Sequence, residues 1–232
     1  MRHDHRQRFR QPHTPALIET LLLEETGELR HLADHLARLA ASTRALGIAC
    51  PLPHIRRRLA CFVWRLPRPR IVRLQLNADG ALHLSHRRLP PAGTAPLPLA
   101  LADVRTHPAD ALLRHKTTRR QFLDAARARA NRRHGAREVL FVNVRGEITE
   151  GSFTNIFIQP PNEDVLLTPP ISCGLLPGIL RQRLLRAGHA REAIITLPAL
   201  RDMLGAGAAL FVGNDIRGLL PTRLLPAFIG GR

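Results

Sequence analysis

A tight turn between two alternating segments constrains the fold of this chain more than any other feature. Residues 71–76 alternate apolar and polar side chains, and residues 81–89 alternate again after the turn Asn77-Ala78-Asp79-Gly80. A period of two on both sides of a turn that ends in Asp-Gly is typical of a β-hairpin, whose successive side chains point to opposite faces. The sequence therefore predicts an antiparallel sheet in this part of the chain.

The first half of the chain, residues 15–105, is expected to form one small α+β unit around this hairpin. Residues 1–14 are basic and have no apolar period, so we predict a disordered tail, and residues 106–112 are predicted to be a linker. The other elements expected here are a strand at 16–23, a helix at 34–45 with Asp34 as its N-cap, a helix at 53–64 and a strand at 97–104.

The second half, residues 113–232, alternates predicted helices and strands and is expected to form a larger unit. The expected elements are a helix at 118–133, strands at 139–144, 153–158 and 165–168, a helix from the turn at 175–178 through 186, a short segment at 193–196, a helix at 197–204 and a strand at 208–212.

Composition excludes several classes of protein. Hydrophobic residues make up 44% and charged residues 23% of the 232 residues, which is typical of a globular protein. No run of 18 apolar residues is present, so no membrane span is expected, and the polar N-terminus does not resemble a secretory signal. The three cysteines are widely spaced and odd in number, which argues against disulfides and a metal site and favours a reducing, cytoplasmic location.

The net charge of +17 raises the possibility of a basic nucleic-acid-binding module. However, the arginines are spread from Arg2 to Arg232 instead of forming one stripe, and aromatic residues make up only 4% of the chain. Few aromatic side chains are therefore present on which bases could stack, and we do not expect nucleic acid to be a partner.

Lys116 is the only lysine among the 35 lysine and arginine residues. Arginine replaces lysine in solvated faces and ion pairs, but a guanidinium does not deprotonate in proteins and cannot act as a primary amine. A sole lysine is therefore a candidate for Schiff-base or general-base chemistry. The count by itself is equally compatible with a lysine that survives by chance.

Six segments, in order and spacing, resemble one family. The segments are HLARL at 35–39, RHKTTRR at 114–120, GEITEGSFTNIF at 146–157, TPPI at 168–171, GLLPGILR at 174–181 and GNDIRG at 213–218. The family that they resemble is the class IV (fold type IV) aminotransferases, which depend on pyridoxal phosphate and include branched-chain and D-amino-acid aminotransferases and aminodeoxychorismate lyase. The resemblance covers residues 16–223.

The resemblance implies a fold, a cofactor and a site. The fold is α+β, a two-domain D-amino-acid-aminotransferase-like fold with a small N-terminal α/β domain and a larger C-terminal α/β domain with a mixed sheet. Lys116 takes the position of the lysine that binds pyridoxal 5'-phosphate covalently, and Glu150 that of the carboxylate facing the pyridine nitrogen. The positions that bind the cofactor phosphate are occupied by Arg38, by Ile179 and Leu180 through their backbone amides, and by Asn214.

Departures from the family pattern indicate which activity to expect. The chain contains no tyrosine, so the tyrosine contacts of the aminotransferases are absent, and threonine is frequent in the family where this chain has Leu180 and Asn214. The start at residues 17–20 and the segment at 115–120 are most similar to the lyases of the family. The resemblance therefore implies a homodimeric lyase that converts 4-amino-4-deoxychorismate to 4-aminobenzoate and pyruvate for folate synthesis. The alternative is an aminotransferase for branched-chain or D-amino acids.

Overall fold

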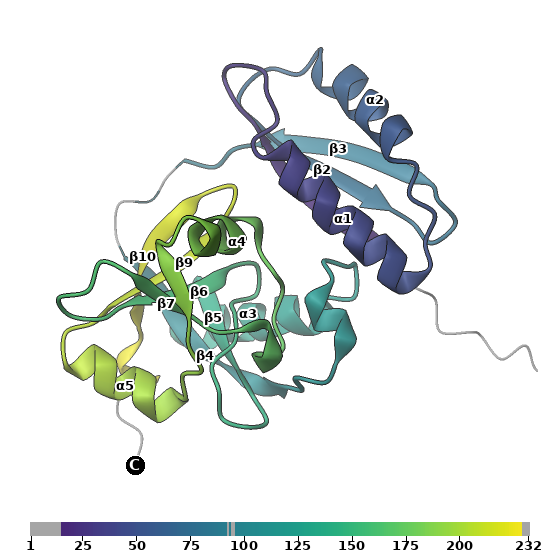
Figure 1. Cartoon of the computed structure of the whole chain (residues 1–232). Coiled ribbons are helices and arrows are strands. Elements are labelled where there is room, and N and C mark those ends of the chain that lie inside the picture. The colour runs from purple at the N-terminus through teal and green to yellow at the C-terminus, as the bar shows by residue number, and fades with distance from the viewer. Residues whose placement is uncertain (1–14, 92, 94–95, 229–232) are drawn as a thin grey trace, which may run out of the picture.

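The computed structural model describes residues 15–91, 93 and 96–228, so the tail expected at 1–14 lies outside the described residues. Two sheets organise this part of the chain: a three-stranded sheet formed near the N-terminus and a seven-stranded sheet built from the rest (Figure 1). Among the described residues, no helix is both long and apolar enough to cross a membrane.

The small unit is the antiparallel hairpin that the sequence predicted, extended by one strand and covered by two helices. Strand β2 pairs with β3 from Arg70↔Arg88 to Leu76↔Leu82, and β1 pairs with the other edge of β2. Apolar side chains of both helices and the alternate residues of β2 form one core, so the two helices share one face of the sheet. The elements are β1 Leu17–Leu23, α1 Leu32–Leu46, α2 Leu52–Val63, β2 Arg70–Leu76 and β3 Leu82–Arg88.

Helix α1 begins earlier than the sequence predicts, and Asp34 is not its N-cap. The cap residue is His31, in the left-handed region at φ 49°, and no side chain caps the helix. Asp34 lies in the first turn, where its two carboxylate oxygens accept hydrogen bonds from Arg183 and Arg186 of the large unit, at 3.1 and 2.9 Å. Two charged donors across the interface stabilise this carboxylate in place of a backbone amide.

The strand expected at 97–104 belongs to the large sheet and not to the first unit. Strand β4, Leu97–Thr106, pairs in parallel with β5, Glu138–Asn143, and with β10, Gly218–Leu224, and its Leu99 and Ala100 are fully buried there. The chain therefore passes from one sheet to the other within residues 89–96, ahead of the segment expected to be the linker. A period of two predicts a strand, but it does not specify which sheet the strand joins.

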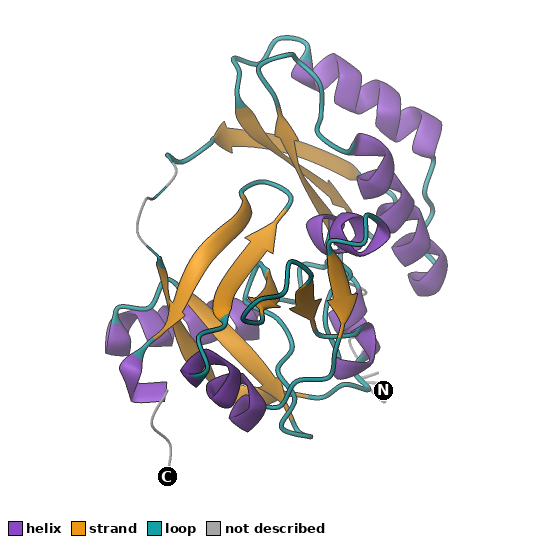
Figure 2. Cartoon of the chain, turned by 60° about the vertical axis from the view of Figure 1, so that its left-hand side comes forward, coloured by secondary structure: helices purple, strands orange, loops and turns teal. Residues whose placement is uncertain are grey.

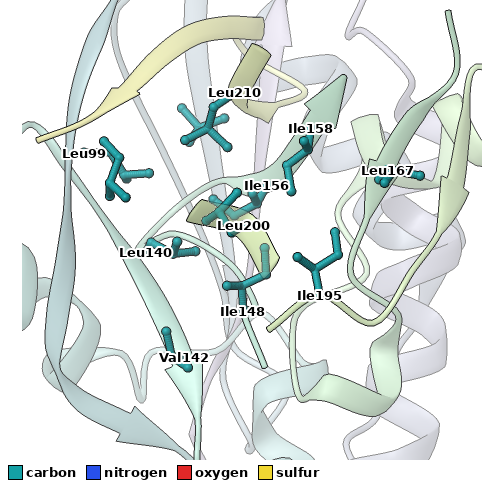
Figure 3. Close-up of a cluster of buried hydrophobic side chains, with 12 residues drawn as sticks. Leu99, Leu140, Val142, Ile148, Ile156, Ile158, Leu167, Ile195, Leu200 and Leu210 are labelled. Carbon is teal, nitrogen blue, oxygen red and sulfur yellow. The ribbon is translucent and has the colours of Figure 1, made fainter. Parts of the chain in front are cut away.

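The large sheet is mixed, with strand order β5-β4-β10-β9-β6-β7-β8. Helix α3 packs on one face of it through Ala126 and Ala130, while the other face forms a larger core that includes Leu200 of α5 (Figures 2 and 3). The remaining elements are α3 Gln121–His134, β5 Glu138–Asn143, β6 Asn155–Gln159, β7 Leu166–Thr168, α4 Ile179–Arg186, β8 Ala190–Glu192, α5 Leu197–Gly205, β9 Ala209–Asn214 and β10 Gly218–Leu224, with short 3-10 turns at Ala111–Arg114, Ile171–Cys173 and Pro226–Phe228.

Candidate active site

A cavity of about 430 Å³ lies between the two units and is lined by both of them. This volume falls within the range of small-molecule and cofactor sites. The small unit contributes side chains from β1, β2, β3 and α1, and the large unit contributes the segments around residues 110–127, 150–155, 176–179 and 214–217. Five of the six predicted site residues line this cavity: Arg38, Lys116, Glu150, Ile179 and Asn214.

Lys116 is held in the cavity by its backbone. Its carbonyl oxygen accepts a 2.7 Å hydrogen bond from the Ile18 amide of β1, and the next residue, Thr117, forms a β-bridge with Leu17. Desolvation in the cavity lowers the pKa of the Lys116 ammonium to about 8, with repulsion from Arg38 as the next contribution. The lowered pKa increases the fraction of free amine near neutral pH over that of an ordinary lysine, and the free amine can attack a carbonyl carbon or accept a proton.

Glu150 is a buried carboxylate with few partners of its own. One oxygen, Oε2, accepts a 3.2 Å hydrogen bond from the Leu176 amide. Burial raises the pKa of this carboxyl to about 8, against the opposing effect of the Leu176 amide. A cationic N–H placed in the cavity would supply the partner that stabilises the ionised form.

Arg38 is fixed by a buried ion pair, and some of its N–H donors are not used by that pair. Its Nε and Nη2 donate to the two carboxylate oxygens of Glu19, at 2.9 and 2.7 Å, and its Nη1 donates to the Pro177 carbonyl oxygen at 3.1 Å. A guanidinium has five N–H donors, so one N–H remains on each terminal nitrogen. The spare N–H of Nη1 lies next to the N-terminus of α4, because Nη1 contacts Pro177, which immediately precedes the cap residue Gly178.

The start of α4 adds backbone donors to the same place. Gly178 caps the helix without any side-chain hydrogen bond, so the first amides, including those of Ile179 and Leu180, have no cap partner. A Cβ on Gly178 would collide with the Asn155 amide, so only glycine allows this close approach. Together, the free donors of Arg38, the α4 N-terminus and the buried Glu150 fit a ligand with an anionic end and a cationic ring nitrogen, such as pyridoxal phosphate.

The side chains of Leu180 and Asn214 make contacts within the protein. The Leu180 side chain does not line the cavity and packs instead against the cluster around Phe157. Asn214 lines the cavity, but its Oδ1 accepts hydrogen bonds from the Ile216 and Arg217 amides, at 3.0 and 3.1 Å, and closes the β9–β10 turn. Any contact from Leu180 to a ligand is therefore restricted to its backbone.

Sequence reasoning missed a buried charged network behind Arg38. His35 lies between Glu19 and Asp215, at 2.6 and 3.1 Å, and all three side chains are buried. Burial alone would raise the pKa of Glu19, but Arg38 and then His35 outweigh burial and lower it to about 2. One signal was available, namely a single acidic residue inside the apolar strand LIETLLL.

A second missed residue is Glu138, which shapes the loop after Glu150. The Glu138 carboxylate is fully buried and accepts hydrogen bonds from the amide and the hydroxyl of Ser152, at 2.9 and 2.6 Å, and from the Thr154 hydroxyl at 3.0 Å. A Cβ on Gly151 would lie 2.9 Å from Glu138 Cδ, so a larger residue would displace this loop. Glu138 thereby fixes the direction in which the chain leaves Glu150.

Arginines gather on one wall of the cavity. The wall consists of Arg73 on β2, Arg120 before α3 and Arg127 on α3. Arg120 donates to Asp124 at 3.0 and 3.1 Å, and Arg127 stacks over the Phe153 ring at 5.3 Å. Within the described residues, Arg127 Nε is buried without a hydrogen-bond partner and Arg73 has no ion-pair partner.

Burial, and then the charge of Arg120, lower the pKa of Arg73. Three guanidinium groups with Asp124 as their nearby carboxylate leave this wall with an excess of positive charge. An anionic group in the cavity would relieve the repulsion between Arg73 and Arg120 and would provide acceptors for the unpartnered donors.

Comparisons with known proteins agree with this geometry. Residues 16–225 match the model of the amino-transferase class IV family. A Schizosaccharomyces pombe protein provisionally described as an aminodeoxychorismate lyase is 28% identical over 204 residues, covering 87% of this chain and 86% of that protein.

Two solved structures share the fold. A Mesorhizobium loti protein provisionally described as an amino-acid aminotransferase is 39% identical, with a TM-score of 0.82 over 90% of this chain and 99% of the other. A Mycobacterium tuberculosis protein, described as a hypothetical aminotransferase in its pyridoxal-phosphate-bound form, is 21% identical, with a TM-score of 0.76 over 92% of this chain and 82% of the other.

Proposed function

Since the chain belongs to the class IV aminotransferases, a family of pyridoxal-phosphate-dependent enzymes, we propose that it is an aminodeoxychorismate lyase. The substrate, 4-amino-4-deoxychorismate, has one amine and two carboxylates, and the products are 4-aminobenzoate and pyruvate. Its likeness to the S. pombe protein over most of both chains supports this choice. As for the related enzymes, we expect the active form to be a homodimer, which sedimentation equilibrium tests.

The observation that carries the proposal is the arginine wall formed by Arg73, Arg120 and Arg127. The phosphate of the cofactor accounts for the donors at Arg38 and α4, which leaves this wall without an assigned anion. A substrate with two carboxylates supplies acceptors for it, whereas a branched-chain amino acid has only one carboxylate and an apolar side chain. The wall therefore favours a dianionic substrate.

We assign the cofactor-binding roles as follows. Lys116 binds the cofactor aldehyde carbon covalently, because it is the only lysine and its amine is deprotonated more readily than usual. Glu150 holds the proton on the pyridine nitrogen, which in turn stabilises the buried carboxylate. Arg38 and the Ile179 and Leu180 amides bind the phosphate, and Asn214 shapes the adjoining turn because its Oδ1 accepts hydrogen bonds from the Ile216 and Arg217 amides.

Bound pyridoxal phosphate supplies an electron sink for the negative charge that develops on the substrate carbon bearing the amine. The free amine of Lys116 would take the proton from that carbon. The carbon–oxygen bond to the enolpyruvyl group then breaks, the ring becomes aromatic, and the departing enolpyruvate takes up a proton to give pyruvate. The reaction releases one pyruvate for each 4-aminobenzoate and consumes no second substrate.

The experiment is a coupled assay on the enzyme loaded with pyridoxal phosphate. We expect 4-amino-4-deoxychorismate alone to give 4-aminobenzoate, measured by its fluorescence, and an equal amount of pyruvate, measured with lactate dehydrogenase and NADH. Arg127→Met should raise KM for this substrate, whereas Arg129→Met, on the same helix but paired with Asp103 at the surface, should not. Absence of both products from the loaded wild-type enzyme would reject the lyase.

The second candidate, an amino-acid aminotransferase, is favoured by the 39% identity to the M. loti protein. This activity requires a keto acid acceptor and releases no pyruvate from the lyase substrate. A panel of amino donors with 2-oxoglutarate or pyruvate as acceptor therefore separates the two functions in the same preparation.

A further inference from the structure

His35 is in contact with a carboxylate at each of its two ring nitrogens. Nδ1 lies 2.6 Å from Glu19 Oε2, and Nε2 lies 3.1 Å from Asp215 Oδ2. A neutral imidazole donates from one nitrogen only and presents a lone pair at the other. Since an ionised carboxylate has no proton to donate, both contacts are favourable only when His35 is the doubly protonated imidazolium.

The charged groups that face His35 come from three separate elements. Glu19 belongs to β1, Arg38 belongs to α1 and shares both oxygens of Glu19, and Asp215 belongs to the β9–β10 turn. His31, at the start of α1, contacts the other oxygen of Asp215 at 2.7 Å, and Arg30 donates to the Asp215 carbonyl oxygen at 3.4 Å. The network therefore connects the helix that carries Arg38 to the turn that carries Asn214.

The charge balance of this network depends on His35. Within the buried part of the network, which excludes the partly exposed His31, an imidazolium at His35 and the guanidinium of Arg38 balance the negative charges of Glu19 and Asp215. With a neutral imidazole, the same buried network has an excess of one negative charge next to the donors of Arg38 and α4. An anion approaching those donors would then be repelled by an uncompensated carboxylate nearby.

We propose that His35 is a positioning residue, which as a permanent imidazolium neutralises the carboxylates around Arg38 and attaches the β9–β10 turn to α1, so that the site accepts the cofactor phosphate. The inference rests on the proposed position of the phosphate at Arg38 and α4. Burial alone would lower the pKa of His35, but its hydrogen bonds to Asp215 and Glu19 outweigh burial and raise it, which agrees with a charged ring.

The first test compares two ligands that differ only in the phosphate. Pyridoxal phosphate and pyridoxal are titrated into the apo form of the full-length wild type and of His35→Gln, and binding is followed by absorbance. We expect His35→Gln to bind pyridoxal phosphate at least tenfold more weakly and to bind pyridoxal as the wild type does. His189→Gln, an exposed histidine far along the chain, is the matched control and should change neither affinity.

Equal weakening for both ligands would show that His35 only supports the fold, and no weakening for either would show that its charge is irrelevant; both results overturn the inference. A second measurement needs no variant. In the 15N-histidine-labelled wild type, the NMR shifts of His35 should report protons on both ring nitrogens at pH 7.5, and a single protonated nitrogen would overturn the inference even if His35→Gln fails to fold.

These outcomes are separate from the lyase assay. If the wild type releases pyruvate but His35→Gln binds both ligands normally, the inference fails and the proposed function stands. If the wild type releases no pyruvate, the ratio of the two affinities still tests His35, because ligand binding is measured without turnover.

Discussion

Replacement of Arg38 tests the phosphate site and the buried network at once. Arg38→Met keeps most of the side-chain stem but removes the guanidinium, which makes two hydrogen bonds to Glu19 and one to the Pro177 carbonyl oxygen. Removing one partner of a buried ion pair costs about 3–5 kcal/mol of folding free energy. We expect the lower part of this range, because His35 continues to donate to Glu19.

The effect on cofactor affinity has a different size and a different origin. A charge-assisted hydrogen bond to a phosphate contributes about 1.5–3 kcal/mol, so the affinity for pyridoxal phosphate should fall by about ten- to a hundredfold. The double variant Glu19→Met/Arg38→Met removes both charges together, and replacing a buried pair by apolar side chains is close to neutral for stability. It should therefore recover part of the folding free energy, because the buried His35 Nδ1 loses its contact with Glu19, while cofactor affinity stays low.

Urea denaturation of the apo proteins measures the first quantity, and titration with pyridoxal phosphate measures the second. Arg129→Met is the control, since Arg129 pairs with Asp103 at the surface, where solvent screens the pair, and its loss should leave the free energy of unfolding nearly unchanged. The reasoning is refuted if Arg38→Met binds the cofactor as tightly as the control does. It is also refuted if the double variant regains cofactor affinity together with stability, because the weaker binding would then be a consequence of unfolding.

The same site leads to four further predictions. Borohydride reduction of the loaded enzyme should attach the cofactor to one tryptic peptide, residues 115–119, because Lys116 is the sole lysine; label found only at the N-terminal amine would contradict its role. Lys116→Arg should remain folded, as measured by circular dichroism, and should keep a cationic side chain, yet it should release no product. Glu150→Gln should bind pyridoxal phosphate but lose about 10²-fold or more in kcat, and near-normal kcat would show that the carboxylate does not act on the ring nitrogen. In the folded protein the pKa of Glu19 is lowered to about 2 from 4.5, so the stability that the ionised carboxylate contributes is complete above pH 4.5 and is lost toward pH 2. The difference in unfolding free energy between wild type and Glu19→Gln should therefore shrink as the pH falls over that interval. A difference that stays constant would refute this assignment.

Local patterns predicted the small unit and most elements of the large one. The hairpin at 70–88, both helices before it and the helix after Gly178 were all expected from periodicity and turn residues. By contrast, the sequence analysis predicts no strand at β10, Gly218–Leu224, which contains Pro221, a residue that is unfavourable in a central strand. The strand forms because β4 and β9 pair with it on its two sides.

The site was predicted in part, for a physical reason. Resemblance to the family identified residues that line the cavity directly, and Arg38, Lys116 and Glu150 are brought together there. It did not identify Glu19 or Asp215, whose positions depend on two elements about 200 residues apart meeting at His35. Such pairings follow from tertiary packing, and no local period or spacing in a single sequence encodes them.

The attachment of Lys116 to β1 determines how ligands enter the cavity. The Ile18 amide donates to the Lys116 carbonyl oxygen at 2.7 Å, and the Thr118 amide donates to the Ala16 carbonyl oxygen at 2.8 Å, so the small unit is joined to the lysine segment by backbone hydrogen bonds. A hinge rotation that separated the two units would break these hydrogen bonds and would displace the Lys116 amine from its position in the cavity. Cofactor exchange should therefore proceed by motion of side chains at the rim, such as Arg87 and Arg119, and its rate should be insensitive to a disulfide engineered to lock the two units together.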